Sequence, residues 1–259
     1  MLLAIDAGNT EVKFGVFRGQ ESQASWRLSR DEARTDDEYG IQLRTLFDIA
    51  GLNVKDVEAI IISSVVPYMN YTLQWMSERY FNITPIFVDH TTDTGLKILY
   101  DRPAELGADR IVDAVAAVEK YGAPCIVIDF GTATTFNAIT SKREYLGGII
   151  VPGIMTAADA LVERTAKLPR VDFERPRKVI GSSTVGALQS GMFWGTVSMI
   201  DGLIERIREG MGGSPKVIAT GGLGPLMEHA SEYIDTLDET LTLDGLCIIY
   251  ERNKVPGQV

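Results

Sequence analysis

The sequence has few of the features that would indicate a secreted, membrane or zinc-binding protein. Its two cysteines, Cys125 and Cys247, lie in apolar segments, which favours buried thiols over a disulfide or a metal pair. The two histidines, His90 and His229, have no Cys, Asp or Glu at the spacing of a zinc site. No apolar run approaches the roughly 20 residues of a membrane-spanning helix. The apolar start before Asp6 lacks the length and basic flank of a signal peptide. We therefore expect a soluble, cytoplasmic protein.

Basic residues are outnumbered. The 259 residues include 25 Lys and Arg against 35 Asp and Glu, a net charge of −10. Nucleic acids and anionic membranes favour a basic surface, so neither is an expected partner. Phosphate ligands remain possible because backbone amides, a few basic side chains and a metal ion can bind a nucleotide. The apolar fraction of 45% is typical of a globular protein, and we expect disorder only in residues 253–259.

An internal repeat organises the chain. Residues 3–10 (LAIDAGNT) and 126–135 (IVIDFGTATT) each place an apolar run before an Asp, a Gly and small polar side chains. Each is followed by a second strand-like stretch, residues 12–17 and 136–140. Both pairs are therefore predicted to be hairpins with an Asp and a Gly-rich turn at the tip. A duplicated hairpin indicates a duplicated domain.

The remaining pattern alternates strands with helices. Further strands are predicted at 59–66, 86–88 and 216–220, and helices at 67–80, 104–120 and 185–207. This alternation predicts an α/β fold with mixed β-sheets and helices on their faces. A turn-forming cluster at 121–124 places the domain boundary between residues 1–121 and residues 122–259. The terminal helix is free in this scheme to pack back on the first domain.

The Asp-x-Gly turns are candidate phosphate sites. A carboxylate at the end of a buried strand can orient a hydrated cation, and the adjacent Gly lets backbone N–H groups approach phosphate oxygens. One such turn is better explained by hairpin conformation alone. Two copies, at Asp6 and Asp129, with a third Gly-rich turn at Gly221 and Gly222, favour phosphate binding.

These residues also carry a family resemblance. Residues 6–10, 129–135 and 219–222 resemble the phosphate and adenosine motifs of the superfamily that contains sugar kinases, heat-shock protein 70 and actin. Within that superfamily, four segments resemble type III pantothenate kinases: 105–110 (ELGADR), 129–135 (DFGTATT), 147–153 (GGIIVPG) and 182–184 (SST). The resemblance implies duplicated actin-like (ribonuclease H-like) domains with an ATP cleft between them.

The resemblance implies that ATP phosphorylates pantothenate, the first step toward coenzyme A. Asp109 would then be the catalytic base, and Arg110 would pair with the pantothenate carboxylate. The other implied substrate-binding residues are Tyr100, Gly107, Ala108 and Thr184. Without the resemblance, the residues favour an exposed charged pair at a helix start for Asp109 and Arg110. Tyr100 could equally be ordinary packing, and Thr184 part of an N-cap cluster.

The same resemblance implies how ATP and metal ions are bound. The implied ATP-binding residues are Asp6, Ala7, Gly8, Asn9, Thr10, Glu11, Val12, Lys13 and Thr132. Asp129 would bind a monovalent cation, K⁺ or NH₄⁺, and Asp6 would hold the Mg²⁺ that accompanies ATP through water. Lys13 is equally well explained as a solvated residue of an alternating strand.

Two other functions are open, and one assembly state is favoured. A kinase for another hydroxylated substrate, such as a sugar, would carry a different loop from residues 107–110, and a non-enzymatic regulator would not need Asp6 and Asp109. The predicted helix 185–207 is apolar around much of its circumference and contains Gly186, Gly191 and Gly195. Such a helix needs cover on more than one face, which favours a homodimer over a monomer with a central helix.

Overall fold

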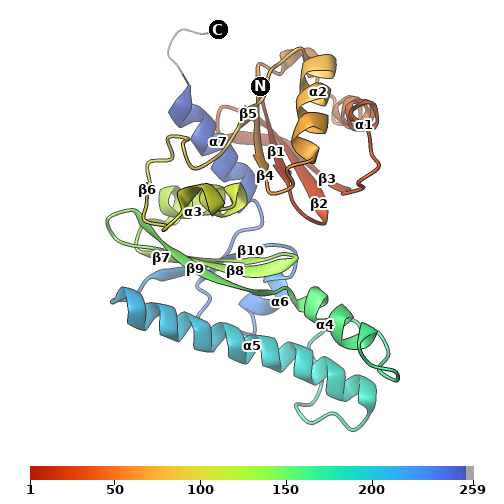
Figure 1. The fold of residues 1–259 in the computed structure, drawn as a ribbon, viewed down its shortest axis with the longest axis vertical. Coiled ribbons are helices and arrows are strands. Elements are labelled where there is room, and N and C mark those ends of the chain that lie inside the picture. Colours follow the sequence, from red (N-terminus) through yellow and green to blue (C-terminus); the bar gives the residue numbers. More distant parts are fainter. Residues whose placement is uncertain (255–259) are drawn as a thin grey trace. The chain divides into compact units, whose positions relative to one another are not determined.

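The chain divides into two compact units (Figure 1). The computed structural model describes residues 1–254. The first unit comprises Met1–Glu119 together with the chain from Thr240 onward, and the second comprises Lys120–Glu239. The terminal helix α7 (Leu241–Asn253) therefore belongs to the first unit. Of the tail expected to be disordered, Asn253 ends α7, and residues 255–259 lie outside the described residues.

A mixed sheet forms the centre of the first unit. Its strand order is β3-β2-β1-β4-β5, with β1 antiparallel to β2 and parallel to β4. The strands are β1 (Leu2–Ala7), β2 (Glu11–Arg18), β3 (Glu21–Ser29), β4 (Ala59–Ser64) and β5 (Ile86–Phe87). The helices of this unit are α1 (Asp36–Ile49), α2 (Met69–Phe81), α3 (Ala108–Tyr121), which runs to the unit boundary, and α7. A short strand β6 (Lys97–Ile98) lies in the segment before α3.

The second unit repeats this topology. Its strands lie in the order β9-β8-β7-β10-β11, with β7 antiparallel to β8 and parallel to β10. The strands are β7 (Cys125–Phe130), β8 (Ala133–Ile139), β9 (Glu144–Pro152), β10 (Lys216–Thr220) and β11 (Thr236–Leu237). The helices are α4 (Ile154–Glu163), α5 (Thr184–Met211) and α6 (Gly224–Glu228). Both predicted hairpins and the duplication are thus confirmed.

Each unit buries one face of its sheet in an apolar core. In the first unit, alternate residues such as Ile5, Phe14 and Ile62 pack against side chains of α1 and α2. In the second, alternate residues such as Ile128 and Phe136 pack against α5. The residues between them, including Asp6 and Asp129, face the opposite side of each sheet.

On that opposite side of the first sheet, α7 packs against β1, β2 and β4. Two glycines allow the close contact. A Cβ added to Gly15 would lie 3.2 Å from a Leu243 methyl, and one added to Gly245 would lie 2.4 Å from the Val112 carbonyl oxygen in α3. The sheet, α7 and α3 therefore form one packed block. This block fixes where the first turn of α3 lies in the first unit.

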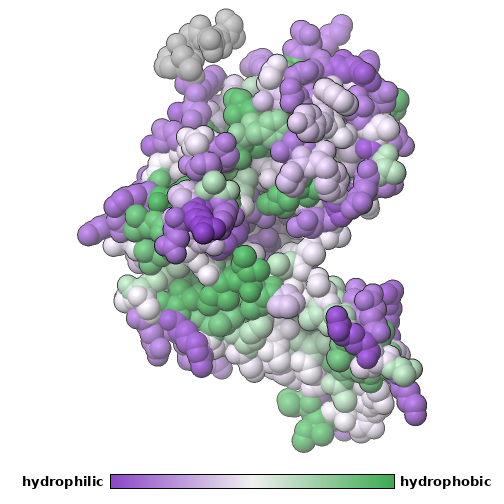
Figure 2. Space-filling model, viewed as in Figure 1, coloured by the Kyte–Doolittle hydropathy of each residue, from purple (hydrophilic) through white to green (hydrophobic). Residues whose placement is uncertain are grey.

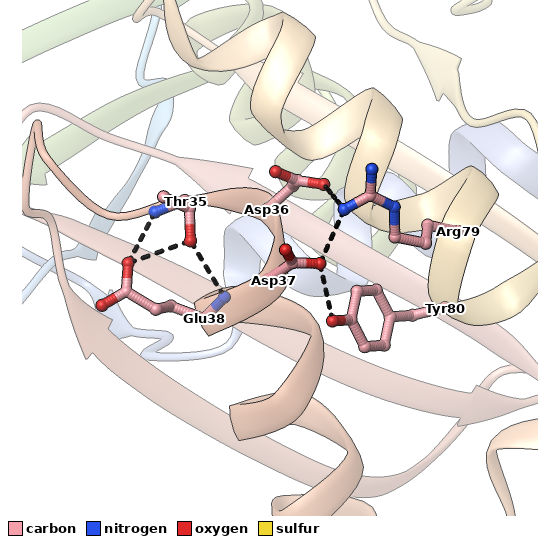
Figure 3. A network of polar contacts seen from close by, with 6 residues as sticks. All are labelled: Thr35, Asp36, Asp37, Glu38, Arg79 and Tyr80. Atoms are coloured by element: carbon pink, nitrogen blue, oxygen red, sulfur yellow. Dashed lines mark hydrogen bonds and ion pairs between the residues drawn. The ribbon is translucent and has the colours of Figure 1, made fainter.

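A polar network joins α1 to α2 at the edge of the first unit (Figure 3). Thr35 caps α1 in a capping box with Glu38, and the Arg79 guanidinium donates to Asp37 at 2.7 Å. Tyr80 also donates to Asp37, at 2.8 Å. These two hydrogen bonds hold the pKa of Asp37 below its ordinary value. The network is exposed, so its effect is to orient the two helices rather than to provide much stability.

Two helix starts differ from the sequence prediction. The helix predicted from residue 104 begins at Ala108, because Pro103–Glu105 form a separate 3₁₀ turn and Leu106 is extended and buried. The helix predicted from residue 67 begins at Met69. The predicted helix 185–207 is confirmed and extends from Thr184 to Met211. Across residues 1–254, every helix is too short or too polar to cross a bilayer.

Candidate active site

The first hairpin presents a tight, polar tip. The Gly8 N–H donates to the Glu11 carbonyl at 3.0 Å, which closes the turn and leaves Asn9 and Thr10 exposed. Arg30 holds this turn from β3's end, since its backbone N–H donates to the Thr10 carbonyl at 2.9 Å and its Nε donates to the Asn9 carbonyl. Arg30 was not predicted, because only the strand pairing brings it to the tip. The exposed backbone here suits phosphate oxygens.

A polar row crosses the first sheet just behind this tip. Asp6 on β1 lies opposite Lys13 on β2 and opposite Ser63 on β4. Asp6 is 7% exposed, and Ser63 is fully buried with an Oγ that has no hydrogen-bond partner in the described part of the chain. Their neighbours Ala7 and Val12 face the apolar core, so of the expected ATP-binding residues these two can offer only backbone groups.

Asp109 lies in the first turn of α3, and it is partly buried. Its Oδ1 accepts a hydrogen bond from the Arg110 backbone N–H at 2.7 Å. Burial raises the pKa of Asp109 above its ordinary value, and the charges of Arg110 and Lys13 oppose this shift. The side chain of Lys13 is 23% exposed, so it is partly buried. Lys13 links Asp109 to the row that contains Asp6.

Gly107 makes room for this carboxylate. A Cβ added at Gly107 would lie 2.5 Å from Asp109 Oδ1 and 3.5 Å from Val65 Cγ1. A real Cβ atom is not found at the first of these distances, so any side chain at this position displaces Asp109. The absence of a side chain at Gly107 therefore leaves space for the Asp109 carboxylate. The family resemblance implied only that Gly107 belongs to a substrate-binding segment.

Arg110 is buried beside Tyr100. Its side chain is 7% exposed, and its guanidinium carbon lies 6.0 Å from the centroid of the Tyr100 ring. The alternative of an exposed charged pair at a helix start is therefore wrong for Arg110. Ala108, 7% exposed, packs in the same turn. A cation held against an aromatic face at a helix start suits the recognition of a carboxylate.

The second unit carries a matching row. Asp129 on β7 lies opposite Thr135 on β8 and opposite Thr220 on β10. A Cβ added to Gly221 would lie 2.4 Å from Asp129 Oδ1, so the turn after β10 must be glycine to approach this carboxylate. Gly221 has a φ of +89°, which also favours glycine.

The turn between β7 and β8 is fixed by hydrogen bonds from residues that follow β9. Thr132 is exposed, and its carbonyl accepts hydrogen bonds from the Gly153 N–H at 3.0 Å and from Thr156 Oγ1 at 2.7 Å. A Cβ added to Gly153 would lie 2.4 Å from the Gly131 and Thr132 carbonyl oxygens. The glycine that ends segment 147–153 is thus required for this turn. Thr156 was not predicted.

Thr184 lies on a different element from Asp129 and Thr132. It is the exposed first residue of α5, and Ser183 is the N-cap, whose Oγ accepts the Gly186 N–H at 3.1 Å. The N-cap role therefore belongs to Ser183, and the Thr184 hydroxyl is available to solvent. Within residues 1–254, no group of three or more His, Cys, Asp or Glu side chains is arranged to hold a metal ion. Cys125 and Cys247 are buried, free thiols.

The two polar rows correspond strand for strand. Because β2-β1-β4 and β8-β7-β10 are equivalent in the repeated topology, Asp6 corresponds to Asp129 and Lys13 to Thr135. In the first unit the carboxylate thus has a lysine as its cross-strand neighbour, and in the second it has a neutral hydroxyl. A single carboxylate with hydroxyl and carbonyl oxygens near it fits a monovalent cation, which needs oxygen ligands but no second carboxylate.

Comparison with known proteins decides the family. A family model described as type III pantothenate kinase matches residues 2–206. A type III pantothenate kinase from Koribacter versatilis is 51% identical over 98% of this chain and 96% of its own length. Another from Halalkalibacterium halodurans is 49% identical over 98% of this chain and all of its own length. This chain belongs to the type III pantothenate kinase family.

Solved structures support the fold of this family member. A Sinorhizobium meliloti protein, provisionally assigned as a 2-dehydro-3-deoxygalactonokinase, has a TM-score of 0.63 at 12% identity and covers 98% of this chain and 97% of its own. A Campylobacter jejuni protein, provisionally assigned to the Baf family of transcriptional activators, has a TM-score of 0.61 at 20% identity, covering 97% and 98%. The predicted fold, duplicated actin-like domains with mixed sheets, is confirmed.

Proposed function

We propose that the protein transfers the γ-phosphoryl group of ATP to the hydroxyl group of pantothenate, forming 4′-phosphopantothenate in the first step toward coenzyme A. The observation that carries this proposal is the partly buried carboxylate of Asp109, which lies in the first turn of α3 beside Arg110 and near the charge of Lys13. The proposal is also supported by the sequence, because the chain belongs to the family of type III pantothenate kinases. We also propose a cytoplasmic location, because the reaction consumes ATP.

Asp109 acts as the general base. Burial disfavours the charged carboxylate and raises its pKa, which makes it a better proton acceptor than an exposed aspartate. It takes the proton of the pantothenate hydroxyl as the bond to phosphorus forms. Arg110, held against Tyr100, pairs with the pantothenate carboxylate. Thr184 donates its hydroxyl to the same substrate, and Gly107 and Ala108 shape the turn that carries Asp109.

The first hairpin binds the ATP phosphates. Gly8, Asn9 and Thr10 offer backbone N–H groups and polar side chains at its exposed tip, and Lys13 supplies a counter-charge. Asp6 holds the Mg²⁺ that accompanies ATP through water, with no direct ligand required from a second carboxylate. Thr132 makes a further ATP contact from its exposed turn. The metal supplies charge neutralisation of the phosphates, which is the main requirement of phosphoryl transfer.

Asp129 holds a monovalent cation, K⁺ or NH₄⁺. The argument is the difference between the two polar rows, since the position of Lys13 in the first is taken by Thr135 in the second. A negative carboxylate near phosphate groups is repelled by them, and a bound cation offsets that repulsion. The cation therefore replaces in the second unit the charge that Lys13 provides in the first.

Substrate specificity provides the test of this function. ATP consumption by the purified protein, with Mg²⁺ and K⁺ present, is expected with pantothenate and not with a panel of sugars that includes N-acetylglucosamine. Mass spectrometry should identify phosphopantothenate as the product. Turnover of a sugar alone would assign the sugar-kinase alternative. No turnover of any acceptor, with folded protein that binds ATP, would favour a non-enzymatic regulator.

We further propose a homodimer formed through α4 and the outer side of α5. Only one face of this helix is buried in the core, by Phe193, Val197 and Ile200 among others. Exposed apolar side chains gather near α4 and the start of α5, and Figure 2 shows apolar surface on the segment that precedes α5. They are Met155, Leu161, Val179, Ile180 and Val185, and three of them line a cavity of about 480 Å³ between α4 and α5.

The glycines of α5 allow the partner to come close. A Cβ added at Gly191 or Gly195 would meet no atom of residues 1–254 within 4 Å, apart from the helix's own backbone. Light scattering is expected to give twice the mass of the 28.4 kDa chain. Leu161→Asp is expected to shift the protein toward monomer, because it places a charge on the apolar surface. A wild-type protein that scatters as a 28.4 kDa monomer at assay concentration would refute the dimer.

A further inference from the structure

The hydroxyl of Thr135 is buried and makes no hydrogen bond to the described part of the protein. Thr135 is 9% exposed, and its Oγ1 accepts and donates no hydrogen bond within the described residues. Buried hydroxyls in folded proteins nearly always have a partner, because leaving one unpaired costs stability. An unpaired hydroxyl beside a candidate cation site is available to a ligand that the protein chain itself does not supply.

The position of Thr135 relative to Asp129 is fixed by strand register. The two residues are direct partners in the antiparallel pair β7–β8, so their side chains lie on the same face of the sheet. Directly opposite residues have Cβ atoms about 4.5–5.5 Å apart, which lets two side-chain oxygens approach one ion. Thr220, 2% exposed, lies on the other side of Asp129 in the parallel pair β10–β7.

A neutral carbonyl oxygen also lies near the carboxylate. A Cβ added to Gly221 would lie 2.4 Å from Asp129 Oδ1 and 2.7 Å from the Phe130 carbonyl oxygen. This carbonyl oxygen therefore lies near the carboxylate. One carboxylate with hydroxyl and carbonyl oxygens has a single negative charge. That is the chemistry of a K⁺ site, in which neutral oxygens replace the hydration shell, and it differs from the carboxylate-rich sites of Ca²⁺.

We propose that Thr135 Oγ1 is a direct ligand of the monovalent cation bound at Asp129. This inference rests on the cation assigned to Asp129 in the proposed function and names a further residue of that site. The hydroxyl offers a lone pair to K⁺, or accepts a hydrogen bond from NH₄⁺. It explains why the second unit keeps a small hydroxyl residue where the first unit has Lys13.

Thr134 provides a matched control. It precedes Thr135 on β8, is fully buried, and also has an Oγ1 without a hydrogen-bond partner among residues 1–254. Successive side chains of a strand point to opposite faces, so Thr134 lies on the side of Phe136, in the core that α5 covers. Thr134→Val and Thr135→Val thus remove the same group from the same strand, and only the second faces Asp129.

The test measures K⁺ binding directly. The melting temperature is followed as KCl replaces choline chloride at constant ionic strength, with Mg²⁺ and a non-hydrolysable ATP analogue present. In the wild-type protein K⁺ should raise the melting temperature, and pantothenate phosphorylation should be much slower in choline or sodium buffer. Loss of a group around a bound metal costs about 10–100-fold in affinity, so Thr135→Val should raise the K⁺ midpoint by about tenfold or more. Thr134→Val should leave it unchanged.

Further variants separate binding from folding. Thr135→Ser keeps the hydroxyl and should retain a midpoint near that of the wild-type protein. Thr135→Val should melt no lower than the wild-type protein without K⁺, because it removes an unpaired hydroxyl. A wild-type midpoint in Thr135→Val, or equal shifts in both valine variants, would overturn the proposal. Absence of any K⁺ effect in the wild-type protein would overturn the cation site as well, whereas the pantothenate assay tests the kinase activity independently.

Discussion

Asp109→Asn is expected to lower kcat by ~10²–10⁴-fold, the usual contribution of general base catalysis. The asparagine keeps the shape of the side chain and can still accept the Arg110 N–H, which donates at 2.7 Å in the native protein. It cannot take a proton from the pantothenate hydroxyl. ATP affinity should change little, because the proposed binding site of the phosphates is the first hairpin. Steady-state kinetics with both substrates varied provide the measurement.

The pH dependence of kcat should identify the same group. Burial raises the pKa of Asp109 above its ordinary value of 3.8, so the acidic fall of kcat in the native enzyme should lie above pH 3.8. The ionised carboxylate is disfavoured in the fold, so its contribution to stability is present below pH 3.8 and lost as the pH rises through the raised pKa. At neutral pH, Asp109→Asn should therefore melt at or above the native temperature.

Two outcomes would distinguish a catalytic role of Asp109 from other roles of this residue. Asp6→Asn is the comparison, since it should weaken the binding of MgATP itself, which fluorescence titration with a nucleotide analogue would detect. If Asp109→Asn turned over at the native rate, the proton would leave by another route, and Asp109 would be a structural charge. If it lost nucleotide binding, its role would lie in ATP recognition.

The local features of the fold could be predicted from the sequence. Both hairpins could be predicted, because each one follows from a local pattern of about ten residues. In that pattern a strand-like stretch leads into an Asp and a Gly-containing turn. The repeat of that pattern at Asp6 and Asp129 then predicted the duplication. The candidate residues of the first unit also lie together, since register joins Asp6 to Lys13, and Lys13 acts on Asp109.

The remainder depends on contacts between distant segments. Ser63 and Thr220 enter the polar rows only through the pairing of β4 and β10 with strands far away in sequence. Thr135 was part of a recognised motif, but its unpaired hydroxyl follows from burial and strand register. Charged residues at a helix start are usually solvated, so the burial of Arg110 at 7% exposure could not be predicted from its position.

Gly107→Ala is expected to lower kcat by about 10²-fold without unfolding the protein, since a displacement of about 1 Å in a catalytic group can cost that much. The new methyl group would lie 2.5 Å from Asp109 Oδ1, so this short side chain must move from the position set by its hydrogen bond to the Arg110 N–H. Gly210→Ala is the control, because at that site in α5 an added Cβ meets no described atom within 4 Å outside the helix's own backbone.

The double variant tests whether Gly107 acts through Asp109. If its role is to leave space for that carboxylate, then Gly107→Ala should have little further effect on kcat in an Asp109→Asn background. Additive losses would show instead that Gly107 contacts the substrate in its own right. A Gly107→Ala enzyme with native kcat would mean that Asp109 moves aside without leaving the reacting hydroxyl. Each of these results requires the melting temperature of the variant as well. Val65 lies 3.5 Å from the same Cβ position, so it is the neighbour whose displacement would lower the melting temperature.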